Sequence, residues 1–123
     1  MKSTNIELQT LPIYQQRLIL KALQYVSQNL TAQSLSVPMV AQEIGVSERQ
    51  LFRLLKSTMN TTPNLLIQEI RLEKARELLE AGEYATVSEV SYAVGYNRPD
   101  YFSDVFERRF GRRPKEYKYS LSQ

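Results

Sequence analysis

The chain has 123 residues, of which 42% are hydrophobic, so it can bury the core of one domain or of two small lobes. It contains no cysteine and no histidine, which excludes disulfides, thiol nucleophiles, zinc sites of the usual kind and imidazole catalysis; we expect no metal and no cofactor. The net charge of +3 and the pI of about 9.2 permit an anionic partner without requiring one.

The chain begins with a polar stretch, residues 1–11, which we interpret as a tail or the remnant of a linker. Pro12 then opens a helix whose apolar residues form one broad face, and this helix is expected to end near Asn29. It is the first element of a predicted N-terminal lobe, residues 12–61.

Two short helices are predicted next, separated by a glycine. Ser36 can cap the first helix, and Gly45 stops it. The second, at about 48–57, begins with Ser47 and Gln50, which have the spacing of a capping box. The local sequence therefore fixes the angle between these two helices.

A longer connector helix is predicted within residues 62–82, with Thr62 as its cap and Gly82 at its end. Two apolar stripes are expected on it, as for a helix that touches a lobe on each side. One contains Leu65, Leu72, Ala75 and Leu79, and the other contains Ile67, Ile70, Leu78 and the stem of Lys74. About 19 helical residues span roughly 28 Å, which is close to the ~34 Å between successive major grooves on one face of B-DNA. Residues 83–123 form the predicted C-terminal lobe.

The pattern of the two short helices occurs twice in the chain. Five positions recur fifty residues later: Val37, Val40, Ala41, Ile44 and Gly45 correspond to Val87, Val90, Ser91, Val94 and Gly95. Thr86 and Glu89 have the spacing of a second capping box, and past the turn the offset becomes 51, so that Leu51 corresponds to Phe102. Two helix-turn-helix units on one chain suggest that the second helix of each enters a DNA major groove.

The helix at 48–57 has a charged side that its leucines do not use. Arg49, Phe52, Arg53 and Lys56 lie on the arc opposite the leucines. Arginine can donate two hydrogen bonds to a guanine edge, and phenylalanine can contact a thymine methyl group. The alternative is a basic helix that is merely solvated, and the repeat argues against it.

At these residues the chain resembles the DNA-binding domain of the AraC/XylS family of bacterial transcription regulators, from about Tyr14 to Tyr117. The stretches that match are AQEIGVSERQLFRLLK at 41–56, PNLLIQEIRLEKARELL at 63–79 and VSEVSYAVGYNRPDYFSDVFERRFGRRPKEY at 87–117. The resemblance implies an all-α fold of about seven helices in two lobes joined by the long helix. It also implies that recognition helices at about 48–57 and 99–109 enter adjacent major grooves.

The resemblance carries specific roles to residues of this chain. Base contacts are expected from Arg49, Phe52, Arg53, Asp100 and Asp104, with Arg98 nearby. Phosphate contacts are expected from Ser47, Thr62, Gln68, Lys115 and Tyr117. We add Lys56, Arg112 and Arg113 to the phosphate contacts because of their charge and, for the last two, because residues 108–118 carry a local charge of +5.

The second unit departs from the family pattern. Asp104 and Glu107 stand where basic residues are usual, Arg98 replaces the usual capping residue, and Asn60 occupies a glycine position where a left-handed residue can be needed. Asp104 either accepts a hydrogen bond from a cytosine amino group or pairs with Arg108 and reads nothing. We favour the ion pair with Arg108. The first unit then supplies most base discrimination, and the second mainly anchors the protein on the DNA.

Two other classes of function compete with DNA binding. A helical module that binds a protein partner and not DNA would use the same exposed face, but its affinity would respond weakly to salt. An enzyme is not expected, because the chain has no nucleophile–base pair and no phosphate loop.

The expected partners are operator or promoter DNA, RNA polymerase, and a fused or missing N-terminal sensor domain. No membrane segment is present, so a cytoplasmic, nucleoid-associated protein is expected.

Overall fold

The computed structural model describes residues 8–31 and 35–117, and these residues form helices joined by turns, with no strand among them. The remaining parts of the predicted tail and of the predicted C-terminal lobe, 1–7 and 118–123, lie outside the described residues. The helices with both ends described are α2 (Ile13–Gln28), α3 (Val37–Ile44), α4 (Glu48–Met59), α5 (Pro63–Ala81), α6 (Val87–Ala93) and α7 (Pro99–Phe110). Residues 114–117 are also helical. The prediction of an all-α fold is confirmed.

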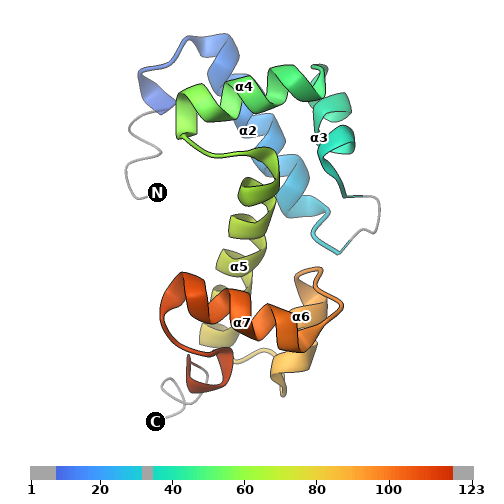
Figure 1. Ribbon diagram of the computed structural model, residues 1–123, viewed down its shortest axis with the longest axis vertical. Coiled ribbons are helices and arrows are strands. Elements are labelled where there is room, and N and C mark those ends of the chain that lie inside the picture. Colours follow the sequence, from blue (N-terminus) through green and yellow to red (C-terminus); the bar gives the residue numbers. More distant parts are fainter. Residues whose placement is uncertain (1–7, 32–34, 118–123) are drawn as a thin grey trace. The chain divides into compact units, whose positions relative to one another are not determined.

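The chain forms two compact units, which are described separately (Figure 1). Unit 1 lies within Met1–Asn29 and Ser34–Gln68, and unit 2 lies within Leu30–Gln33 and Glu69–Gln123. The division falls inside α5, so the first turns of this helix belong to unit 1 and the rest to unit 2. Among the described residues, no helix is long and apolar enough to cross a membrane.

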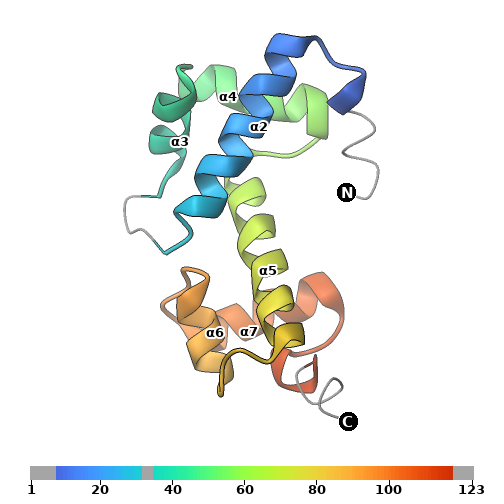
Figure 2. The same cartoon turned by 180° about the vertical axis from the view of Figure 1, so that it is seen from behind.

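Unit 1 is built from α2, α3, α4 and the start of α5. Helix α2 packs against α3, as Figure 2 shows, and α3 is joined to α4 by a turn at Gly45 with φ of 79°. This left-handed conformation favours glycine, as the sequence predicted. The core of unit 1 contains Ile19, Ala22, Val26, Val40, Ala41, Ile44, Leu51, Leu55 and Leu66.

The start of α4 is a complete capping box. The Gln50 N–H donates to Ser47 Oγ at 3.1 Å, and the Ser47 N–H donates to Gln50 Oε1 at 2.8 Å. Two backbone donors that an isolated helix end would leave unpaired are thereby satisfied. The predicted box is confirmed, and it fixes the direction in which α4 leaves the turn.

Asn60 ends α4 in the left-handed region, with φ of 51° and ψ of 43°. Asparagine tolerates this region better than other residues that carry a Cβ atom. We expect Asn60→Ala to lower the free energy of unfolding by about 1 kcal/mol, whereas Asn60→Gly should change it by only a few tenths. Urea unfolding of the two variants measures this difference, and an alanine variant as stable as the glycine variant would contradict it.

Unit 2 repeats the packing of unit 1. Val90, Ser91 and Val94 are buried at the positions that correspond to Val40, Ala41 and Ile44. Phe102 and Phe106 are fully buried where α4 has Leu51 and Leu55. Their rings pack 5.7 Å apart, centroid to centroid, against α5 residues Leu72, Ala75 and Leu79. The internal repeat predicted from the sequence is therefore also a structural repeat.

Three local details differ from the predictions or decide between them. The Glu89 N–H donates to Thr86 Oγ1 at 3.1 Å, but the Glu89 carboxylate accepts from the Thr86 hydroxyl instead of the Thr86 N–H, so this capping box is only half formed. Arg98 is the N-cap of α7 and makes no side-chain cap bond. Leu65 was expected on a buried stripe of α5 but is 54% exposed, whereas its neighbour Leu66 is buried.

Candidate nucleic-acid interface

The outward side of α4 carries the residues predicted to read bases. Arg49, Phe52 and Arg53 are exposed, and so is Lys56. On the opposite side Leu51 and Leu55 are buried and Leu54 is half-buried. Phe52 is 47% exposed on this charged side of the helix, although a large apolar side chain is usually buried. The predicted orientation of this helix is confirmed.

The cations on α4 are available to an anionic partner. In the described parts of the chain, none of Arg49, Arg53 and Lys56 has an ion-pair partner. Ser47 lies at the N-terminus of the same helix, where the helix dipole is positive. Its oxygen already accepts from Gln50, but its hydroxyl proton can still be donated to a phosphate oxygen.

Two further predicted phosphate contacts lie on the part of α5 that belongs to unit 1. Thr62 precedes the first turn, and its Oγ1 accepts from the Leu65 N–H at 3.3 Å, so the predicted cap is confirmed. Gln68 lies two turns further on and is half-buried. Thr62 is half-buried as well.

The outward side of α7 is acidic, and its acids are paired within unit 2. Arg113 Nη1 contacts Asp104 Oδ1 at 3.4 Å and Glu107 Oε1 at 3.0 Å, and Arg98 contacts Asp100 at 3.1 Å. These hydrogen bonds, first with Asp104 and then with Glu107, raise the pKa of Arg113. The pKa of Asp100 is lowered, chiefly by a hydrogen bond from the Tyr101 N–H.

The predicted partner of Asp104 was wrong. The pairing expected with Arg108, four residues along the helix, is replaced by one with Arg113, nine residues along the chain. The reason is the turn at Gly111, whose φ of 80° lets the chain reverse after α7 and brings Arg113 back beside the helix. Arg113, predicted to contact phosphate, is therefore bound to two carboxylates of its own unit.

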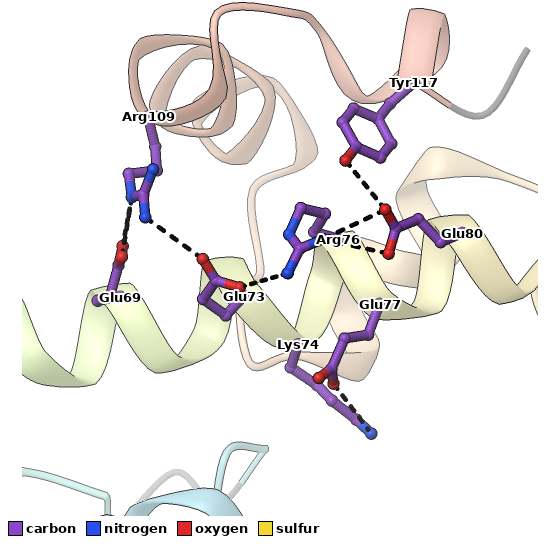
Figure 3. A network of polar contacts seen from close by, with 8 residues as sticks. All are labelled: Glu69, Glu73, Lys74, Arg76, Glu77, Glu80, Arg109 and Tyr117. Atoms are coloured by element: carbon purple, nitrogen blue, oxygen red, sulfur yellow. Dashed lines mark hydrogen bonds and ion pairs between the residues drawn. The ribbon is translucent and has the colours of Figure 1, made fainter. Parts of the chain in front are cut away.

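A second set of ion pairs ties α7 to the part of α5 in unit 2 (Figure 3). Arg109 Nε contacts both oxygens of Glu69, at 2.6 and 2.8 Å, and its Nη2 contacts Glu73 at 3.3 Å. The hydrogen bond to Glu69 raises the pKa of Arg109. The Tyr117 hydroxyl donates to Glu80 at 3.1 Å. Arg109 and Tyr117 thus bind the protein itself, although Tyr117 was predicted to contact phosphate.

The other cations of the basic run differ in their surroundings. Arg112 donates to the Glu116 carbonyl at 3.0 Å and lies 5.5 Å from the Tyr117 ring centroid. Lys115 and Arg108 are exposed. Lys118, the last residue of the run, lies outside the described residues. The run therefore offers less free positive charge than its composition indicates.

A half-buried arginine in unit 2, Arg71, was not predicted from the sequence. Arg71 Nη2 donates to the Leu30 carbonyl at 3.1 Å, and its guanidinium lies 6.0 Å from the ring centroid of Tyr96. Desolvation lowers the pKa of Arg71, and burial raises the pKa of Tyr96 to about 12. Gly95 makes room for this contact, since a Cβ atom there would lie 2.0 Å from the Leu30 oxygen. No local sequence signal joins residues 41 positions apart.

Comparisons with known proteins agree with this geometry. Residues 40–120 match the model of a helix-turn-helix domain family. A transcriptional regulator of Chromobacterium violaceum with an AraC-type DNA-binding domain superposes with a TM-score of 0.81, at 30% identity over 88% of this chain and 95% of that one. The C-terminal domain of AraT, a response regulator of Geobacillus stearothermophilus, gives a TM-score of 0.74, at 31% identity over 84% of each chain.

A much longer protein is also similar. The histidine kinase P4 of Formosa agariphila is 38% identical over 114 residues, which are 93% of this chain and 8% of the kinase. This chain therefore spans only a small part of the length of that relative.

Proposed function

This chain belongs to the AraC-type family of helix-turn-helix DNA-binding domains of transcription regulators, and from this membership we propose that α4 and α7 each enter a major groove of operator DNA. The family is one of DNA-binding domains and not a family of enzymes. It also argues against a module that binds only proteins, which was the alternative drawn from the sequence.

The observation that carries the proposal is the exposed side of α4. Its arginines and Phe52 combine the groups that recognise guanine and the thymine methyl group. They project from a helix whose start is fixed by the Ser47 capping box, so their backbone is rigid before DNA binds. Lys56 and the Ser47 hydroxyl lie on the same helix and are proposed to contact phosphates.

Unit 2 is proposed to contribute less to base discrimination than unit 1. Asp100 and Asp104 are the residues proposed to face the bases, and both are paired with arginines. Lys115 and Arg112 are proposed to contact phosphates at the end of α7. A carboxylate in the groove is repelled by the phosphates unless a cation lies beside it.

A selection of duplexes from a random pool, followed by anisotropy titrations at several salt concentrations, tests the proposal. We expect one preferred sequence with two half-sites about one helical turn apart. With several phosphate contacts, the affinity should fall by orders of magnitude as salt rises from about 50 to 200 mM. A dissociation constant that barely changes over this range would contradict DNA binding through these residues.

The whole protein's role is a further part of the proposal. One relative is named a histidine kinase and one structural neighbour a response regulator, and both are longer signalling proteins or parts of them. We propose that this domain works in the cytoplasm beside a fused sensor region and acts at promoters together with RNA polymerase. The signal and the direction of control would then depend on that larger protein, whereas the operator sequence would be selected by α4 and α7.

A further inference from the structure

The Asp104–Arg113–Glu107 cluster assigns Arg113 a role other than phosphate binding. We propose that Arg113 is a positioning residue that holds Asp104 as the acceptor for a cytosine amino group at one base pair of the second half-site. The inference rests on the proposed function, because it specifies how α7 would read DNA.

Geometry is the first support. Asp104 and Glu107 lie almost one turn apart on the outward side of α7, and Arg113 Nη1 reaches an oxygen of each. The contact to Asp104 uses Oδ1 at 3.4 Å. An ionised carboxylate can accept about four hydrogen bonds, so Asp104 keeps the capacity to accept from a base.

Charge is the second support. A carboxylate that approaches the bases also approaches the phosphates on both sides of the groove, and their repulsion opposes binding. Arg113 lowers this cost because it places one positive charge between the carboxylates of Asp104 and Glu107. Without it, Asp104 and Glu107 would face the phosphates as two uncompensated charges.

The hydrogen-bonding chemistry of a carboxylate indicates which base Asp104 would contact. A carboxylate only accepts hydrogen bonds, and in the major groove it is matched by the N4 amino group of cytosine. Guanine presents only acceptors on that edge, so a carboxylate would be repelled from it. The second half-site should therefore contain one position where cytosine is preferred and guanine is the worst base on that strand.

The test is a scan of single-base substitutions in the selected duplex with wild type, Asp104→Ala, Arg113→Gln and Arg113→Lys. Wild type should prefer cytosine over guanine at one position by about fivefold or more. Asp104→Ala should remove this preference, and Arg113→Gln should reduce it at the same position. Arg113→Lys keeps the charge and should retain a measurable part of it.

Arg108→Gln is the matched control, because it removes an exposed arginine of α7 that has no ion-pair partner among the described residues. It should weaken binding to all sequences alike and leave the cytosine preference intact. Exposed ion pairs contribute little to stability, so every variant should unfold at a temperature close to that of wild type.

Two results would overturn the inference. One is an Arg113→Gln variant that loses affinity uniformly and keeps the preference, as a plain phosphate contact would. The other is an Asp104→Ala variant whose base preferences match those of wild type. Failure of the proposed function gives a different result, since wild type itself would then bind no duplex with a salt-dependent affinity.

Discussion

Gly95→Ala should lower the free energy of unfolding by about 2 to 5 kcal/mol, the largest effect we expect from a change of one methyl group in this chain. Two causes add. Gly95 has φ of 97°, a conformation that is strained for any residue with a Cβ atom. The added Cβ would also lie 2.0 Å from the Leu30 carbonyl oxygen and 2.8 Å from Arg71 Nε, and the first of these is backbone that cannot rotate away.

The repeat supplies a matched control for this substitution. Gly45 is the counterpart of Gly95 in unit 1, with φ of 79°, but a Cβ atom there would meet nothing within 4 Å. Gly45→Ala should therefore show only the conformational strain, about 1 to 2 kcal/mol. Chemical unfolding gives both values, and hydrogen exchange should show faster exchange in α6 and α7 for the first variant and in α3 and α4 for the second.

Equal losses for the two glycines would contradict this account. They would mean that the Leu30 carbonyl and Arg71 move aside at little cost, and that the contact between them does not restrict the turn. A smaller loss at Gly95 than at Gly45 would be a stronger contradiction, because the close approach adds a cost at Gly95 only.

The features predicted correctly from the sequence depend on neighbours along the chain. The Ser47 cap, the glycine turns and the exposed side of α4 each follow from residues within about four positions of one another. A helix has fixed geometry, so spacing alone decides which side chains share a face. The left-handed conformation of Asn60 was expected for a different reason, because Asn60 occupies a glycine position of the family pattern, and the structure confirms it.

The features that the sequence did not predict depend on contacts between residues that are far apart along the chain. Asp104 was matched with Arg108 because only the helical repeat was considered, whereas the reversal at Gly111 brings Arg113 closer. Leu65 was placed on the stripe that Leu72 continues, but the first turns of α5 belong to unit 1 and the later ones to unit 2. The residues that α5 buries in unit 2 therefore do not predict which side of its first turns is buried in unit 1.

Arg53→Ala should weaken binding to the preferred duplex by about 1 to 3 kcal/mol and weaken binding to random DNA much less. Arg53 is exposed on α4 and has no ion-pair partner among the described residues, so its fork is free to donate to a guanine edge. Its removal should leave the fold intact, because an exposed charge contributes little to stability.

Two variants separate recognition by Arg53 from its charge. Arg53→Lys keeps the charge but cannot make the two parallel hydrogen bonds, so it should lose most of the preference for the selected site and keep its affinity for random DNA. Arg17→Ala removes an exposed arginine of α2 and should affect both duplexes slightly and alike. If Arg53→Ala instead weakened both duplexes equally, Arg53 would act through its charge alone, and the base discrimination of unit 1 would have to come from Arg49 and Phe52.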